Sequence, residues 1–319
     1  MDIITGISKI RSWLMGVAMV SILLFHQEFV KGNPILDFFN HYGHWGVQIF
    51  IFVSGFGIWY ALNKGNYSLN AFYARRLIRI MPASILGGVL ALALTWETSI
   101  AQNLLKISGL SLWYIRTILI LYLVSPVLYV CFKGTRRTLW YVLLMFAAFA
   151  IYAVACHTME YWWMGSWKLR QTVIWTLGQI PFYLSGMYLA SESKEKSVFS
   201  FLIVLACCCF IPYVFDFAQE GEIRWLKLIH SFSVLLISAQ GTILSRCLPA
   251  CINRSIEWCG EHSLELYVCH EAIYTFLYKL NGAAYMLPIA LVASFLAAYG
   301  ISVASRAIVR LSKRWSCVA

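Results

Sequence analysis

The sequence predicts an all-α polytopic membrane protein, a bundle of about ten transmembrane helices with both termini on the cytoplasmic side. Hydrophobic residues make up 61% of the 319 residues and charged residues only 12%, and the mean hydropathy is +0.71. Soluble domains are about 25% charged, so this composition excludes an ordinary soluble domain. It is typical of a chain that crosses a lipid bilayer several times.

Stretches of about 20 mostly apolar residues, the length that spans a bilayer as a helix, recur along the chain. Ten such stretches lie near residues 13–30, 44–62, 80–96, 112–132, 138–156, 172–190, 198–217, 226–245, 263–280 and 284–308. The loops between them are short, so we expect one integral membrane domain over residues 1–319 with no appended soluble domain. The first stretch begins like a signal peptide, but no small-x-small cleavage site follows it, and we interpret it as a retained helix.

The excess of basic residues is explained by membrane topology. The formal net charge is +11, with 25 lysines and arginines against 14 acidic residues. When the N-terminus is assigned to the cytoplasm, most of the basic residues fall in cytoplasmic segments, as the positive-inside rule requires. We therefore expect no nucleic-acid partner. The ten cysteines show no metal-ligand spacing, and we interpret them as packed free thiols with no metal site.

Polar residues at the end of the first apolar stretch are candidates for chemistry. The segment SILLFHQEFV, residues 21–30, places His26, Gln27 and Glu28 after an apolar run, and a second such pair is His270–Glu271. A polar side chain is costly in lipid, so each one is a functional candidate. The alternative is ordinary hydrogen bonding between helices, which we favour for an isolated residue such as Gln240.

A group of arginines precedes the third predicted span. In NAFYARRLIRIMP, residues 70–82, Arg75 and Arg79 share one helix face at i and i+4, with Arg76 beside them. Guanidinium groups suit phosphate oxygens, although the positive-inside rule alone also predicts such a group. We expect Pro82 to mark a break or the first position of the helix that follows.

Taken in order, these features resemble the acyltransferase-3 family of integral membrane acyltransferases. The matching motifs are FH (25–26), GVQIFIFVSGFGI (46–58), FYARRLIRIMP (72–82), LWYIRTILILYLVSP (112–126), IPFYLSGMYLA (180–190) and GEHSLELYVCH (260–270). They cover nearly the whole chain in the family's order. The resemblance implies a bundle of about ten helices that passes an acyl group, mostly acetyl, from cytoplasmic acyl-coenzyme A to a sugar hydroxyl at or beyond the outer face.

The resemblance also implies the catalytic residues. His26 matches the first-helix histidine regarded as catalytic, and it either removes a proton from a hydroxyl or carries the acyl group itself. His270 matches the last motif and is a second catalytic candidate, with an interhelical hydrogen bond as the alternative. Glu28 is the third candidate, because a carboxylate of Glu28 or Glu271 can orient His26, although the sequence itself shows no such contact.

For the donor, the resemblance implies that Arg75, Arg76 and Arg79 bind acetyl-coenzyme A or another acyl-coenzyme A as a substrate, with no permanently bound cofactor. Arg11 and Trp113 complete the candidate donor site. Two positions depart from the family's pattern, because Gln48 replaces an aspartate and Met15 replaces an arginine eleven residues before the histidine.

The nearest basic residue to that missing arginine is Arg11. On a helix it lies about 60° off the face of His26 and about 22 Å from it along the axis. Arg11 is therefore a poor positional substitute.

The predicted partners are acyl-coenzyme A, a sugar or glycan acceptor and the bilayer of the inner or plasma membrane. Aromatic residues in YWWMGSW, residues 161–167, either stack on sugars or belong to the interfacial belt. Three other interpretations stay open: a polytopic transporter, a non-catalytic relative, and an acyltransferase that acts on a lipid or small molecule.

Overall fold

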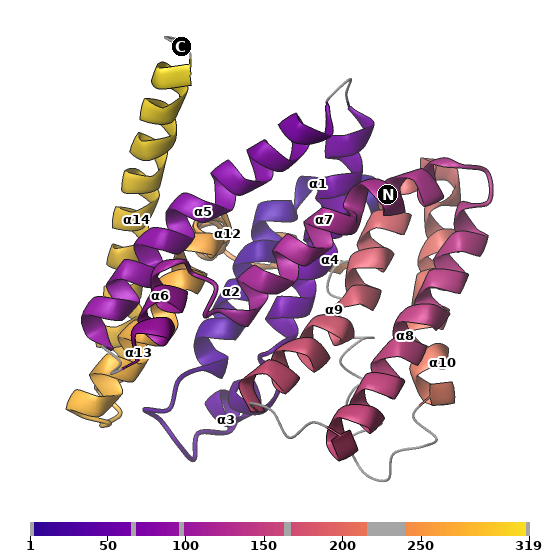
Figure 1. Ribbon diagram of the computed structural model, residues 1–319. Helices are drawn as coiled ribbons and strands as arrows, with labels where there is room; N and C mark the ends of the chain where they lie inside the picture. The colour runs from indigo at the N-terminus through magenta and orange to yellow at the C-terminus, as the bar shows by residue number, and fades with distance from the viewer. Residues whose placement is uncertain (1–2, 65–67, 96–98, 163–166, 216–239, 317–319) are drawn as a thin grey trace. The chain divides into compact units, whose positions relative to one another are not determined.

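The computed structural model describes residues 3–64, 68–95, 99–162, 167–215 and 240–316, and every regular element within these ranges is a helix (Figure 1). The all-α prediction is confirmed for this part of the chain. The helices are α1 (Ile3–Lys9), α2 (Arg11–Phe25), α3 (Pro34–Tyr42), α4 (Trp45–Asn63), α5 (Leu69–Leu94), α6 (Ile100–Ile107), α7 (Trp113–Lys133), α8 (Arg137–Trp162), α9 (Trp167–Ser191), the 3-10 turn η1 (Lys194–Lys196), α10 (Ser197–Phe215), α12 (Ala250–Glu261), α13 (Ser263–Leu280) and α14 (Met286–Ser316).

Several of these helices are long and apolar enough to cross a membrane. Five qualify within the described residues, namely α4, α5, α7, α14 and the Arg137–Cys156 part of α8. A sixth span results if α1 and α2, which bend by 68° at Ile10, are counted together. A multi-pass membrane protein is therefore supported, with five or six spans in the described part.

The sequence predicted ten spans, which is more than the five or six candidate spans found in the described residues. The eighth predicted span, 226–245, lies mostly outside the described residues. The ninth forms α13, but Glu265, Glu271 and Lys279 give it more charge than an ordinary spanning helix carries. The count of ten and the sidedness of the termini stay predictions.

Two predicted boundaries are wrong in an informative way. The first span was predicted to continue to residue 30, but α2 ends at Phe25, so His26 lies immediately beyond the helix. Pro82 was predicted to mark a break or a helix entry, but it lies inside α5, which is continuous from Leu69 to Leu94. The helix begins thirteen residues before Pro82, where the Ser68 hydroxyl accepts a hydrogen bond from Ala71 N at 3.2 Å. The side-chain cap at Ser68, rather than the proline, determines where this helix starts.

The described residues divide into two compact units, each assembled from separate parts of the sequence. Unit 1 comprises Met1–Leu14, Val47–Tyr67 and Thr117–Asn253, and unit 2 comprises Met15–Gly46, Ser68–Arg116 and Arg254–Ala319. The single integral membrane domain over residues 1–319 stays a prediction.

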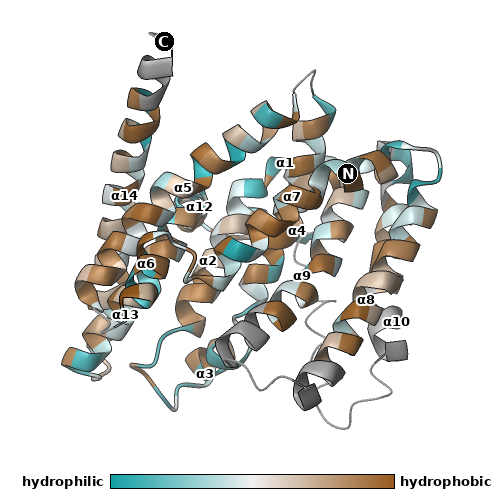
Figure 2. Cartoon of the chain, in the orientation of Figure 1, coloured by the Kyte–Doolittle hydropathy of each residue, from teal (hydrophilic) through white to brown (hydrophobic). Residues whose placement is uncertain are grey.

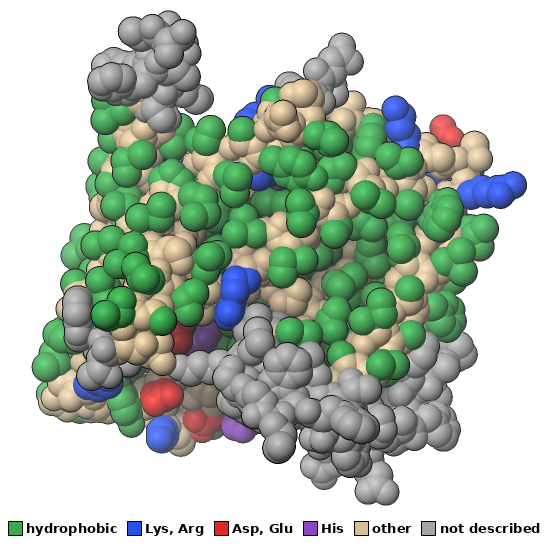
Figure 3. All heavy atoms as spheres, in the orientation of Figure 1, with side chains coloured by type: hydrophobic (Ala, Val, Ile, Leu, Met, Phe, Trp, Pro, Cys, Tyr) green, Lys and Arg blue, Asp and Glu red, His purple; other side chains and the backbone are tan. Residues whose placement is uncertain are grey.

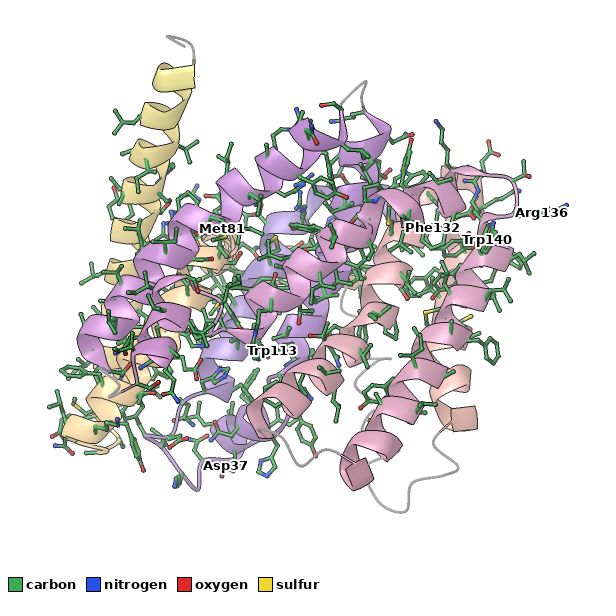
Figure 4. All side chains as sticks on the ribbon, viewed as in Figure 1. Asp37, Met81, Trp113, Phe132, Arg136 and Trp140 are labelled. Carbon is green, nitrogen blue, oxygen red and sulfur yellow. The ribbon has the colours of Figure 1, made fainter. Side chains whose placement is uncertain are left out.

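In unit 1, helices α8, α9 and α10 pack side by side (Figure 1). Their buried polar groups pair across helices, as membrane bundles require. Tyr141 donates to or accepts from Ser185 Oγ at 2.9 Å, and its ring stacks on that of Tyr188 with centroids 4.3 Å apart. Arg136 extends outward from the turn between α7 and α8 (Figure 4).

In unit 2, α13 packs against both α5 and α14, and α5 packs against α6. Small residues permit this approach. A Cβ atom added at Gly87 would lie 2.4 Å from the Val268 side chain, and one at Gly88 would lie 1.9 Å from the carbonyl oxygen of Lys106. Figure 1 shows α5 and α13 running in the same direction, from the upper to the lower part of the view, with α14 returning beside them.

The outer faces of the long helices are apolar. On α14 the exposed side chains of Ile289, Val292, Leu296 and Val303 form one stripe at helical spacing. Figure 2 shows hydrophobic colouring along the exposed turns of α8 and α14, and Figure 3 shows hydrophobic side chains covering the same helices. Exposed apolar stripes of this length are typical of helices that face lipid.

We expect Gly88→Ala to lower the stability of the protein. A methyl group cannot fit 1.9 Å from the backbone oxygen of Lys106, so α5 and α6 must separate, at a cost of about 1–3 kcal/mol. Thermal unfolding in detergent measures the effect.

The matched control is Gly300→Ala on α14, where a Cβ meets no atom within 4 Å. This variant should unfold at the same temperature as the wild type or slightly higher, since alanine favours a helix. Equal stability of Gly88→Ala and Gly300→Ala would contradict the described contact between α5 and α6.

Candidate functional site

The His-Gln-Glu run after α2 separates into residues with different roles. Gln27 is 1% exposed, and its side-chain amide donates to Val30 O at 3.1 Å and accepts from Val30 N at 3.0 Å. Its amide nitrogen also donates to the Asn40 side-chain oxygen on α3, at 3.2 Å. Gln27 thus fixes the turn that follows α2. This turn holds its neighbours His26 and Glu28, which both line the cavity described below.

The structure brings His26 and His270 together in unit 2. The ring centroids lie 5.0 Å apart, and Nε2 of His270 lies 3.4 Å from Nδ1 of His26. His270 is 1% exposed in the middle of α13, whereas His26 is half-buried. The two histidines are 244 positions apart in the sequence, so the contact is a product of the fold.

The surrounding carbonyl groups determine where each histidine carries its proton. His270 Nδ1 lies 3.1 Å from Leu266 O and 2.9 Å from Tyr267 O, and carbonyls only accept, so Nδ1 is the protonated nitrogen. Nε2 of neutral His270 is then an acceptor. It faces His26 Nδ1, which also lies 3.0 Å from Ile22 O.

Because both neighbours of His26 Nδ1 accept hydrogen bonds, we assign the proton of His26 to Nδ1. Nε2 of neutral His26 then carries a free lone pair. This is the tautomer that a general base or a nucleophile needs, and the second histidine holds it in place.

A cavity of about 250 Å³ lies beside this pair, entirely within unit 2. The segment after α2 contributes His26, Glu28 and Phe29 to its lining. One face of α13 contributes the rest, at the helical spacing of Glu271, Tyr274, Thr275, Tyr278 and Lys279. Figure 3 shows acidic and histidine side chains gathered in this region, between the lower end of α13 and α3.

Glu28 and Glu271 line the cavity without touching the histidine. Both are exposed, and among the described residues neither forms a hydrogen bond to His26. The residue that orients His26 is instead His270. Glu28, a predicted catalytic residue, therefore lies near the reactive group as part of the cavity wall.

The three predicted donor-binding arginines lie near the start of α5. Arg75 and Arg79 are exposed, and the Arg76 guanidinium stands over the ring of Phe72 at 5.5 Å. Gly87, which meets Val268, is eight residues beyond Arg79, or about 12 Å along the helix. Since α5 and α13 run in the same direction, the arginines and the cavity lie toward opposite ends of this helix pair.

The remaining two predicted donor residues lie in separate parts of the structure. Trp113 forms the first turn of α7, within unit 2 (Figure 4). Arg11 starts α2 and belongs to unit 1, where its guanidinium packs against Gly57 of α4, 3.1 Å from the position of a Cβ atom. Met15 takes the family's arginine position and is half-buried.

Comparison with known families identifies the chain. The acyltransferase domain family model Acyl_transf_3 matches residues 12–307, nearly the whole sequence. The chain belongs to the acyltransferase-3 family. No curated protein and no solved structure matches it. The chain is therefore an acyltransferase, which confirms the resemblance read from the motifs.

Sequence reasoning missed five of the eight cavity residues of this acyltransferase. Tyr274, Thr275, Tyr278 and Lys279 follow the recognised motif, which ends at His270, and Phe29 looked like part of an apolar span. The available signal was the spacing of Glu271, Thr275 and Tyr278 on one helix face. It was not decisive, because nothing in the sequence showed that this face adjoins His26.

Nitrogen-15 NMR of histidine-labelled protein tests the proton assignment. In the wild type at pH 7.5 we expect the Nδ1–H tautomer for His26, with Nε2 unprotonated. His270→Phe removes the acceptor next to Nδ1 and should shift His26 toward a mixture of tautomers. An Nε2–H tautomer in the wild type, or identical His26 spectra in both proteins, would refute the assignment.

Proposed function

We propose that this acyltransferase moves an acetyl group from cytoplasmic acetyl-coenzyme A to a hydroxyl of a cell-surface or lipid-linked sugar, with His26 as the general base. The observation that carries the proposal is the pair of hydrogen-bond acceptors around His26 Nδ1, which leaves Nε2 able to take a proton. His26 also lines a cavity large enough for a small hydroxyl compound.

In the proposed reaction, Nε2 of His26 removes the proton from the acceptor hydroxyl. The oxygen attacks the thioester carbonyl, and the carbon–sulfur bond breaks as the ester forms. The departing thiolate takes the proton from His26, so the base is regenerated. His270 positions His26, because Nε2 of His270 accepts the hydrogen bond from Nδ1–H of His26. The same hydrogen bond stabilises the His26 imidazolium that forms during the reaction.

Acetyl-coenzyme A carries several phosphate charges, and we assign its binding to Arg75, Arg76 and Arg79. Two of these guanidinium groups are exposed on α5, as a site for a soluble donor requires. Phosphate–guanidinium contacts are strong and directional. The donor's acyl arm must then extend along α5 and α13 toward His26.

We propose that ten spans place both termini in the cytoplasm, in the cell membrane. In this topology α5 begins on the cytoplasmic side, which matches the donor, and α13 ends on the outer side, which matches an extracytoplasmic acceptor. The positions of the arginines and the cavity on this helix pair support that arrangement.

His26→Ala should reduce the transfer of radiolabelled acetyl groups from acetyl-coenzyme A by about 100- to 10,000-fold, the usual contribution of a general base. His41→Ala is the matched control, since His41 is exposed on α3. Full activity in a folded His26→Ala protein would refute the proposed role. If the wild type, but not His26→Ala, becomes covalently labelled by acetyl-coenzyme A before the acceptor is added, His26 carries the acyl group instead of acting as a base.

Arg75→Ala and Arg79→Ala should each raise the KM for acetyl-coenzyme A about tenfold or more and change the acceptor KM little, because each removes charged hydrogen bonds to phosphate. Arg310→Ala on α14 removes an exposed arginine of the same unit without touching α5. Equal KM values for all three variants would exclude the α5 arginines as the donor site.

A further inference from the structure

The end of α2 is bonded by an asparagine from another helix. Leu24 lies in the last turn of α2, where carbonyl groups need partners from outside the helix. The side-chain amide of Asn40, on α3, faces the carbonyl oxygens of Leu24 and Gln27 at 2.9 and 3.0 Å. Carbonyl groups only accept hydrogen bonds, so we assign the amide nitrogen of Asn40 to this side, where it donates to both.

The other half of the same amide bonds the Gln27 side chain. With the nitrogen of Asn40 on the carbonyls, its oxygen accepts from Gln27 Nε2. Leu24 lies two residues before His26 and Gln27 one residue after it, so Asn40 holds the backbone on both sides of His26. A rotation of the backbone between these two points would break at least one of the hydrogen bonds. The position of the His26 ring therefore depends on Asn40.

Two glycines bring α3 close enough for this contact. A Cβ atom at Gly43 would lie 2.6 Å from Ser21 O, and one at Gly46 would lie 2.3 Å from Ala18 O. Ser21 Oγ also donates to Gly43 O at 2.9 Å. Asn40, Gly43 and Gly46 follow one another at intervals of three residues, so this segment runs antiparallel along α2 with no side chain between the two backbones. A side chain as short as that of asparagine then reaches the carbonyl groups of α2.

Hydrophobic burial does not explain how α3 is held. No residue of α3 is buried, and Ile35 and Phe38 are 69% and 53% exposed. Asn40 is half-buried, and it lies outside the six motifs that resemble the family. An apolar side chain at position 40 would fill the same space, but it would leave the carbonyl groups unpaired. The specific contribution of Asn40 is thus its amide.

We propose that Asn40 is a positioning residue for acyl transfer, because its amide fixes the backbone around His26 and so keeps the imidazole on Nε2 of His270. Asn40 does not touch the reacting atoms, and it acts through His26 alone. The inference rests on the proposed function, since that function makes His26 the base.

Asn40→Asp tests the proposal. The change keeps the size and the accepting oxygen, but it replaces the donating nitrogen by an oxygen that repels both carbonyl groups. We expect kcat for acetyl transfer to fall about 10- to 100-fold, the cost of moving a reacting group by about 1 Å, with an unchanged KM for acetyl-coenzyme A. Nitrogen-15 NMR should show a mixture of His26 tautomers instead of Nδ1–H.

A double variant separates positioning from general stability. In a His26→Ala background, Asn40→Asp should lower the remaining activity by less than about twofold, because the group that Asn40 positions is already absent. A residue that merely stabilised the fold would cause its full loss in both backgrounds. Thermal unfolding confirms that each protein is folded.

Asn33→Ala is the matched control on the same helix. The Asn33 side-chain oxygen accepts from Ile35 N and Leu36 N at 3.1 and 3.2 Å, so this variant loosens the start of α3 without touching α2. Its kcat should stay within about twofold of the wild type, and its His26 spectrum should not change.

The wild type offers a measurement that needs no variant to fold. The side-chain amide protons of Asn40 should exchange with water at least about tenfold more slowly than those of Asn33, because those of Asn40 face carbonyl groups in the protein. Asn33 is exposed and bonds through its oxygen. Exchange measured by nitrogen-15 NMR on asparagine-labelled protein in nanodiscs gives both rates.

The proposal is overturned if folded Asn40→Asp keeps a normal kcat and a normal His26 spectrum, or if Asn33→Ala causes an equal loss. Equal exchange rates for Asn40 and Asn33, or a full additional loss in the His26→Ala background, would also overturn it. A changed His26 spectrum with a normal kcat would instead support the contact and reject His26 as the base of the proposed function.

Discussion

The hydrogen bonds of His270 to the carbonyls of Leu266 and Tyr267 are the interaction on which the site depends. They use the normal geometry of a helix, in which a side chain reaches back over the preceding turn. By fixing the proton on Nδ1 of His270, they turn Nε2 into an acceptor for His26. A reactive nitrogen near the end of α2 is thus prepared by backbone groups of a helix far away in the sequence.

Close packing of α5 on α13 then determines the distance between the two halves of the reaction. Gly87 meets Val268, two residues before His270, and neither helix can slide without a clash. The arginines of α5 lie about 12 to 18 Å along the helix from that contact, and the cavity lies beyond it. The proposed donor-binding arginines and the cavity beside His26 therefore lie toward different ends of one closely packed helix pair.

The sequence predicted the class of fold and the chemical groups but not their contacts. Hydropathy identified the helices, and the ordered motifs singled out His26, His270 and the α5 arginines. Turn chemistry was less visible, since Gln27 reads as part of a polar run and proves to be the residue that ends α2 in a fixed turn. Asn40 had no signal, because its bonds to the end of α2 can be recognised only once the two segments are seen side by side.

The contacts of His26 show whether the arginine that Met15 replaces is needed to hold the imidazole. Eleven residues along a helix amount to about 16 Å, too far for a guanidinium to bond the imidazole directly. A cation close to His26 would also oppose its protonation. The two neighbours of Nδ1, Ile22 O and His270, are both present in this chain. The replacement therefore leaves both hydrogen-bond partners of His26 Nδ1 in place, and with them the tautomer that the proposed base requires.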